Sequence, residues 1–252
     1  MRSTSDTSEH REWDTAARDT IFARERQGLA QRHFIQSLRL AKAADHTGFG
    51  AHILANMSTQ AVYLQQPGEA VRLARAAVDG GRGRAQVAVM ARLYTAEACA
   101  QASAGDARSC ATALRLAEKA TGKAATSDDH PAWAGYFTPA HLAGTAVRCF
   151  RDLGQTGQAL AYAGQALDLA EGSVRTRALH TALIASVHAS GPGADPELAS
   201  HLGHQALDLA GVVRSLRVAD RIKDLTGRLW RFRGNTTVDG FLHRAAGTAS
   251  AA

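Results

Sequence analysis

A six-residue sequence that occurs twice most constrains the fold of this chain. QALDLA stands at 165–170 and returns at 205–210, an offset of 40 residues. An identical hexapeptide at such an offset is typical of a repeat architecture, in which each unit buries its apolar face against its neighbours. A repeat core grows in one dimension, so 252 residues can share it without exceeding the size of a single globular core.

Small residues recur at one register along the chain. Steps of 40 and 49 residues around Ala159 reach a series of small side chains: Ala30, Ala70, Cys110, Ala159 and Ala199. Four residues later stand Phe34, Ala74, Leu114, Ala163 and Gly203, and three later again stand Ser37, Ala77, Ala117, Ala166 and Ala206. Spacings of four and three place these positions on one stripe of a helix. Because small side chains let a second helix approach closely, each unit is predicted to be a helix-turn-helix hairpin.

This register resembles the tetratricopeptide repeat, whose second helix carries small, aromatic and small residues at these spacings. Ala30, Phe34 and Ser37 fit that pattern best, and its turn glycine is present at Gly105 and Gly154. The turn glycine is absent at Glu25 and Gln65. The resemblance implies an all-α fold: a right-handed superhelix, or solenoid, of about five to six tetratricopeptide-like hairpins.

The helical period and its interruptions predict six pairs of helices. We expect a disordered tail over 1–11, a tetratricopeptide-like repeat domain over 12–233, and a C-terminal capping helix and tail over 234–252. The predicted pairs are 12–27 with 29–44, 47–64 with 68–80, 84–104 with 106–121, 132–153 with 156–170, 173–190 with 196–210, and 213–233 with 236–247.

Composition excludes several classes of protein. Alanine, leucine and arginine are abundant, which favours helix. The polar start MRSTSDTSEHRE is unlike a secretory signal, and no run of about 18 apolar residues is present to span a membrane. Cys99, Cys110 and Cys149 are odd in number and lack metal-ligand spacing, so buried thiols in a reducing cytoplasm are expected.

No motif in the chain indicates catalysis, a metal site or a cofactor. HExxH, CxxC, GxSxG, GxxxxGK[ST] and GxGxxG are all absent. His201 and His204 have helical chelate spacing, but a metal site needs a third ligand. Asp128, Asp129 and His130 precede Pro131 as the start of a helix would. We therefore predict no catalytic residue, no metal and no cofactor.

Polar residues on the first helix of each pair are the candidate binding residues. In tetratricopeptide solenoids these helices line the concave face, where ligands usually bind. Asn and Arg side chains there could hold a peptide backbone or a carboxylate. Alternatively, the same residues form ordinary polar faces or hydrogen bonds between repeats. The candidates are His52, Asn56, Gln60, Arg92, Glu97, Tyr136, His141, Arg148, Arg177 and His180.

The last part of the chain is the most basic, and Trp230 and Phe232 interleave with its arginines. The net charge of +6 permits contact with nucleic acid without establishing it. Since apolar residues such as Ile222 and Leu229 form a stripe in the same segment, an amphipathic capping helix with a solvated basic face is the preferred interpretation. Nucleic acid is not a predicted partner.

From His46 onward the chain resembles the tetratricopeptide region of actinobacterial, Streptomyces-type transcriptional regulators. The residues that carry the resemblance are GAHILANMSTQAVYLQQPGEAVRLARAA (50–77), DDHPAWAGYF (128–137), CFRDLGQTGQAL (149–160), RALHTALIASVHASG (177–191) and LGHQALDLAGVVRSLRVADRIKDL (202–225). Such regulators usually carry an Xre-type helix-turn-helix before the repeats. Residues 12–44 show only one hairpin, so DNA binding is not carried over.

Together these features predict a non-enzymatic, cytoplasmic scaffold or regulatory protein that binds a protein or peptide in its concave groove. The alternative is a small-molecule-binding protein or an enzyme of a specialised-metabolite pathway on the same scaffold, with Tyr136, His141, Arg148 and His180 in a pocket. The apolar face of Trp13, Ile21 and Phe22 leaves a homodimer open.

Overall fold

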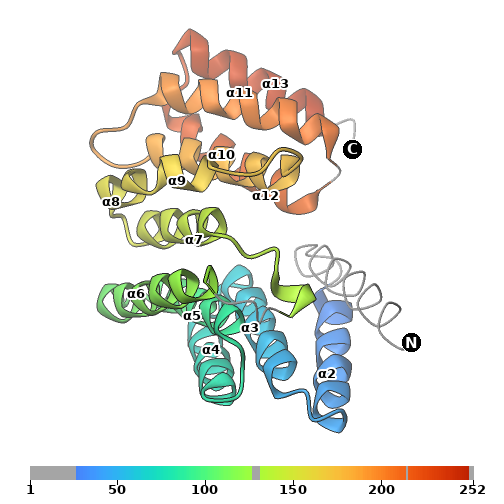
Figure 1. The fold of residues 1–252 in the computed structure, drawn as a ribbon. Coiled ribbons are helices and arrows are strands. Elements are labelled where there is room, and N and C mark those ends of the chain that lie inside the picture. Colours follow the sequence, from blue (N-terminus) through green and yellow to red (C-terminus); the bar gives the residue numbers. More distant parts are fainter. Residues whose placement is uncertain (1–26, 127–130, 214, 250–252) are drawn as a thin grey trace. The chain divides into compact units, whose positions relative to one another are not determined.

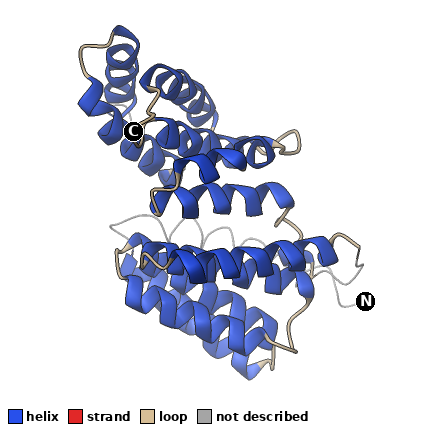
Figure 2. Ribbon diagram, turned by 90° about the vertical axis from the view of Figure 1, so that its left-hand side faces the viewer, coloured by secondary structure: helices blue, strands red, loops and turns tan. Residues whose placement is uncertain are grey.

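The described part of the chain is built of helices and loops. A computed structural model describes residues 27–126, 131–213 and 215–249, and no strand occurs in these ranges (Figures 1 and 2). The predicted all-α class is thereby confirmed. The predicted tail and the helix over 12–27 lie outside the described residues, apart from Gln27. The chain divides into two units, Met1–Thr145 and Ala146–Ala252, with the boundary inside helix α7 (Pro139–Asp152).

The described part of unit 1, residues 1–145, consists of consecutive helix pairs. Helix α3 packs against α4, α5 packs against α6, and α5 also contacts both α3 and α4. Helix α2 packs against α3. The helices are α2 (Gln27–Ala43), α3 (Thr47–Tyr63), α4 (Pro67–Gly81), α5 (Val87–Ser103) and α6 (Ala107–Ala124), followed by the short 3-10 helix η2 (Ala132–Ala134).

Unit 2, residues 146–252, repeats this arrangement. Helix α10 packs against α11, α12 contacts both of them, and α13 packs against α11 and α12. The helices after α7 are α8 (Thr156–Ala161), α9 (Ala163–Leu167), α10 (Val174–His188), α11 (Pro196–Val212), α12 (Leu216–Leu229), the 3-10 helix η3 (Trp230–Phe232) and α13 (Thr236–Ala249). Within each unit, sequential pair packing is consistent with a helical repeat.

The predicted stripe of small residues forms the helix interfaces. Ala30, Ala70, Cys110, Ala159 and Ala199 are each at most 2% exposed, and Ala77, Ala117, Ala166 and Ala206 are fully buried. Alanine and cysteine side chains are short, so the paired helices approach closely. The predicted stripe is confirmed at these positions, whereas Ser37 and Ala163, which also belong to it, are half-buried. The predicted burial of the thiols is confirmed for Cys110 and Cys149, whereas Cys99 is half-buried.

The turns between paired helices share one backbone conformation. Gly105, Gly154 and Gly234 have φ values of 77°, 73° and 96°, in the left-handed region that glycine adopts without steric cost. Gln65 occupies the same place after α3 with φ of 57°. The turn geometry is therefore kept where the expected glycine is missing.

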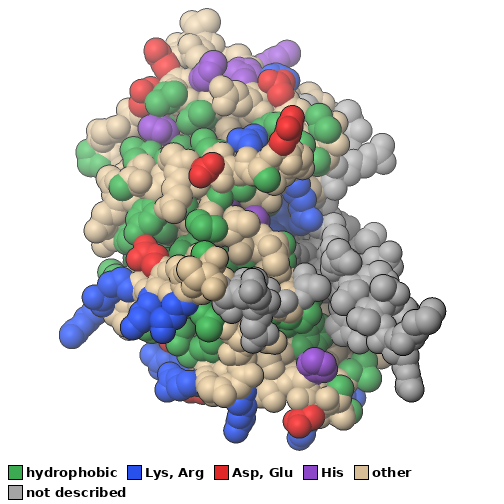
Figure 3. Space-filling view, in the orientation of Figure 1, with side chains coloured by type: hydrophobic (Ala, Val, Ile, Leu, Met, Phe, Trp, Pro, Cys, Tyr) green, Lys and Arg blue, Asp and Glu red, His purple; other side chains and the backbone are tan. Residues whose placement is uncertain are grey.

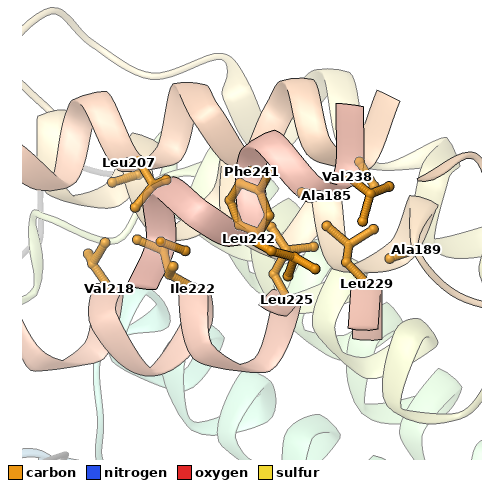
Figure 4. Packing of buried hydrophobic residues seen from close by; sticks show 13 residues of the cluster. Ala185, Ala189, Leu207, Val218, Ile222, Leu225, Leu229, Val238, Phe241 and Leu242 are labelled. Carbon is orange, nitrogen blue, oxygen red and sulfur yellow. The ribbon is translucent and has the colours of Figure 1, made fainter. Parts of the chain in front are cut away.

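The core of unit 2 lies between its last four helices. Leu207 of α11, Val218, Ile222, Leu225 and Leu229 of α12, and Val238, Phe241 and Leu242 of α13 are all less than 10% exposed (Figure 4). Gly203 of α11 lies against the Phe241 ring, and a Cβ there would come within 2.6 Å of Cε2. Glycine at 203 thus lets α13 dock on α11.

One predicted helix, 132–153, is wrong over its first part. The chain forms only the short η2, passes through Gly135 and Thr138, and begins α7 at Pro139. Proline disfavours helical backbone at the residue before it and is well placed at a helix start, so α7 begins there. The segment before Pro139 is therefore not part of α7.

The predicted helix 156–170 is shorter than expected and interrupted. It divides at Tyr162 into α8 and α9, and α9 ends at Leu167. Gly164 lowers helix propensity in this region. Arg177 of α10 donates to the carbonyls of Leu167 and Leu169 at 3.1 and 2.9 Å, which satisfies them outside a helix.

Candidate functional site

The ten candidate residues fall into three groups. His52, Asn56, Gln60, Arg92, Tyr136 and His141 belong to unit 1, and four of them, His52, Asn56, Arg92 and Tyr136, are connected on the face shared by α3 and α5. Glu97 also belongs to unit 1 but lines a groove on another side of α5. The third group, in unit 2, consists of Arg148, Arg177 and His180.

A buried hydrogen-bond chain joins α3 to α5. The guanidinium of Arg92 donates through Nη2 to Oδ1 of Asn56 at 2.9 Å, and the Asn56 amide nitrogen lies 3.1 Å from Nε2 of His52. His52 and Asn56 are four residues apart, so they lie on one side of α3. They are 1% and 4% exposed. Because the bond from Arg92 fixes the amide orientation, Nε2 of His52 accepts and its proton lies on Nδ1.

The segment 131–138 lies on the same face. The Trp133 ring packs on His52, with 4.8 Å between ring centroids, and meets the edge of Phe49 at 5.3 Å. Nε of Arg92 donates to the Tyr136 hydroxyl at 3.3 Å. Ala134 joins the apolar cluster of Ala51, Val89 and Leu93. Side chains that follow α6 therefore cover the polar residues of α3 and α5.

Gln60 and His141 lie at the margins of this group. Gln60 is 5% exposed, inside α3. Nδ1 of His141 lies 2.9 Å from the Thr138 hydroxyl, and its ring meets the Tyr136 ring with 6.0 Å between centroids. Sequence reasoning missed Trp133 and Phe49. The dense aromatic run WAGYF between Pro131 and Pro139 was the available signal.

Glu97 lies apart from this hydrogen-bonded group, in a groove formed by α4, α5 and α6. It lines a groove of about 290 Å³ whose walls are α4 and α6 and whose floor is α5. Burial raises the pKa of its carboxyl above the ordinary 4.5, against the opposing effect of Arg75. The groove also contains Gln101, which is 3% exposed.

Arg177 and His180 have structural partners in unit 2. Besides the two bonds from Arg177, Nδ1 of His180 lies 2.6 Å from the carbonyl oxygen of Ala166, so Nδ1 donates to it. Burial lowers the pKa of His180, and Arg217 and Arg221 lower it further against the effect of the Ala166 carbonyl. Both side chains hold the end of α9 against α10.

Arg148 belongs to a group of charges that joins α7, α10 and α12. Its Nε lies 3.6 Å from Asp152, while Arg151 donates to Asp152, Ser186 and Asp224 at 2.7, 2.9 and 3.0 Å. Burial raises the pKa of Asp152, but Arg151 and Arg148 outweigh this effect and the pKa is lowered. Arginine and aspartate here neutralise each other within the unit.

The remaining sequence candidates also have structural partners. Nδ1 of His204 lies 3.4 Å from Arg244, and His201 lies 3.1 Å from Gln205. Arg228 and Arg231 donate to Ser190 and to the Ala189 carbonyl. Within the described ranges no group of three or more His, Cys, Asp or Glu could hold a metal ion. Asp128, Asp129 and His130 lie outside these ranges.

Comparisons with family models and with curated proteins found no match: no protein-family model matches the chain, and no curated protein shows significant similarity to it. Among the helices in the described ranges, none combines the length and apolar character needed to cross a membrane. The inference of function therefore depends on the geometry of the chain itself.

Proposed function

We propose that this chain is a non-enzymatic, tetratricopeptide-like repeat protein that binds a protein or peptide partner on the concave face of its first helices. In this proposal the sequential pairs continue as a right-handed superhelix of five to six hairpins. The recurring buried stripe and the left-handed turns support that architecture. A regulatory or scaffold role in the cytoplasm is part of this proposal. It is supported by the sequence resemblance to the tetratricopeptide region of Streptomyces-type transcriptional regulators.

The observation that carries the proposal is the placement of residues 131–138. This short, largely irregular segment lies on α3 and α5 as a bound peptide would. Trp133 is its aromatic anchor against Phe49 and His52, and Tyr136 accepts from Arg92. Aromatic anchors supply most of the affinity in peptide interfaces, and arginine supplies directional hydrogen bonds. The face of α3 and α5 therefore has the chemistry of a surface for aromatic peptide segments.

A peptide copy of the segment provides the test. A fluorescent peptide PAWAGYFTP, residues 131–139, is titrated against the wild-type chain and against a Trp133→Ala, Tyr136→Ala double variant. Fluorescence anisotropy should show at least about tenfold tighter binding to the double variant, because its own segment no longer competes. Adding Arg92→Ala should weaken that binding again.

Two controls define the outcome. A peptide with both aromatic residues replaced by alanine should not bind, and circular dichroism should show that the variants keep their helices. A folded double variant that does not bind the native peptide at millimolar concentration would remove the support for this function.

A further inference from the structure

The groove between α4 and α6 contains polar groups that the fold leaves without partners. Neither the carboxylate of Glu97 nor the side-chain amide of Gln101 makes a hydrogen bond with any residue in the described ranges. Gln101 is 97% buried, since only 3% of it is exposed. A buried amide normally finds a partner, so the Gln101 amide beside the half-buried Glu97 carboxylate along a groove points to a ligand that supplies one.

The walls of the groove add cationic groups. Arg75 of α4 and Arg108 of α6 both line it, and neither forms an ion pair with a described residue. The third arginine, Arg82, pairs with Asp79 at 3.6 Å on the exposed part of α4. In Figure 3, Lys and Arg side chains gather over the part of unit 1 that contains α4 to α6.

Apolar side chains complete the lining. Val78 of α4 is buried, Tyr94 of α5 is half-buried, and Ala113 and Leu116 come from α6. The volume of about 290 Å³ is at the lower end of the range of small-molecule sites. The site therefore suits a compact ligand with one apolar group.

We propose that this groove binds a small zwitterion of the amino-acid class. The ammonium group would donate to Glu97 and Gln101, and the carboxylate would accept from Arg75 and Arg108. The apolar side chain would contact Val78, Tyr94 and Leu116. A purely cationic ligand would face Arg75 and Arg108, which have no close ion pair in the described ranges, and a purely anionic one would face Glu97 and Asp79, so a molecule with both charges fits best.

The site is independent of the proposed partner face. Arg92 and Glu97 are five residues apart on α5, which corresponds to about 140° around the helix axis. A ligand in the groove therefore approaches α5 from a side away from Trp133 and Tyr136. Loss of peptide binding and loss of zwitterion binding can be observed separately.

Amino-acid binding is the direct test. The twenty standard L-amino acids are screened by thermal shift, and the one with the largest effect is measured by calorimetry beside its decarboxylated amine and its deaminated acid. The amino acid should bind at least about tenfold more tightly than either singly charged analogue. Binding of an analogue as tight as that of the amino acid, or no binding of any amino acid at 10 mM, would overturn the proposal.

Variants assign the binding to the groove. Glu97→Gln and Arg75→Ala should each weaken amino-acid binding at least about tenfold. Arg72→Ala is the matched control, because Arg72 lies on α4 and pairs with Glu69 at 2.6 Å instead of lining the groove. Undiminished affinity in both groove variants would place the ligand elsewhere and contradict the assignment.

Lowering the pH gives a further check. Ionised Glu97 pairs with the ammonium, so affinity should fall as Glu97 is protonated, and the fall should be absent in Glu97→Gln. The charged and titratable groups around Glu97 are Arg75, Asp79 and Arg82 of α4, Tyr94 of α5, and Arg108 of α6. An equal pH dependence in the wild type and in Glu97→Gln would contradict the role of this carboxylate.

Discussion

The two sides of helix α5 differ in whether their charged residues have hydrogen-bond partners within the fold. Arg92 donates through Nη2 to Asn56 of α3 and through Nε to Tyr136 after α6, so both partners lie inside the unit. Glu97 lines the groove between α4 and α6, and its carboxylate makes no hydrogen bond or close ion pair in the described part of the chain. The polar groups on the α3 side of α5 therefore have partners within unit 1, whereas the side chains of Glu97 and Gln101 on the groove side have no hydrogen-bond partner in the described part of the chain.

The difference separates polar residues whose partners lie within the fold from polar residues that lack such partners. A buried group with all partners supplied contributes to folding, and its removal leaves those partners unsatisfied. A half-buried carboxylate without a partner destabilises the fold slightly and is retained for another reason, such as binding. Stability measurements can therefore test the assignment of each side without knowledge of the ligand.

The largest effect is expected for Arg92→Ala. This change leaves Oδ1 of the buried Asn56 without its donor and removes the bond to Tyr136, so the free energy of unfolding should fall by about 2–3 kcal/mol. Urea unfolding followed by circular dichroism measures it. Arg72→Ala, which removes an exposed arginine of α4, should cost less than about 0.5 kcal/mol. Equal losses in the two variants would break the comparison.

Trp133→Ala should have the next largest effect. The half-buried ring packs on both Phe49 and His52, so its loss should lower the free energy of unfolding by about 2 kcal/mol. Trp230 is 52% exposed, and in the described ranges the one contact of its ring with a charged or aromatic group is with Arg233. Trp230→Ala should therefore lower the free energy of unfolding by about 0.5–1 kcal/mol. A smaller loss for Trp133 than for Trp230 would show that the segment 131–138 is not held on α3.

Tyr136→Phe tests the hydroxyl alone. The ring remains, but the acceptor for Nε of Arg92 is removed, and about 1 kcal/mol of stability should be lost in the same urea assay. Tyr94→Phe provides the control on the groove side, since the Tyr94 hydroxyl makes no hydrogen bond with a described residue. That variant should stay within about 0.5 kcal/mol of the wild type. If Tyr94→Phe cost more than Tyr136→Phe, the two sides of α5 would be wrongly assigned.

The pairs α3 with α4, α5 with α6 and α10 with α11 could be predicted because their determinants are local. Small residues at 70, 74 and 77, and again at 110 and 117, mark the buried side of α4 and α6 within a few turns. The turn at Gln65 was predictable from the register, although its residue type gave no signal. The segment 131–138 could not be placed, because Trp133 meets Phe49 across 84 residues and no periodicity connects them.

The sequence could indicate the candidate residues, but it could not separate those with partners inside the fold from those that line the groove. Helical spacing distinguishes Arg92 from Glu97, but the sequence does not say which side of α5 a neighbour covers. Arg75 and Arg108 reach the groove from α4 and α6, so their proximity to Glu97 depends on the packing of three helices. Arg177 and His180 were expected on a binding face, and their partners are the carbonyls at the end of α9.

The smallest effect, and the one with a distinctive sign, is expected for Glu97→Gln. Burial raises the pKa of Glu97 above 4.5, so the folded chain binds this proton more tightly than the unfolded chain. Stability contributed by Glu97 therefore falls as pH rises from 4.5 through the raised pKa and stays lower above it.

The glutamine variant carries no such charge. At about pH 3.5 the two melting temperatures should agree, whereas at about pH 7.5 the variant should melt about 1 °C higher, a small gain because solvent screens a half-exposed group. A variant that is less stable than the wild type at neutral pH would mean that Glu97 has a stabilising partner in the fold, and the contrast with Arg92 would disappear.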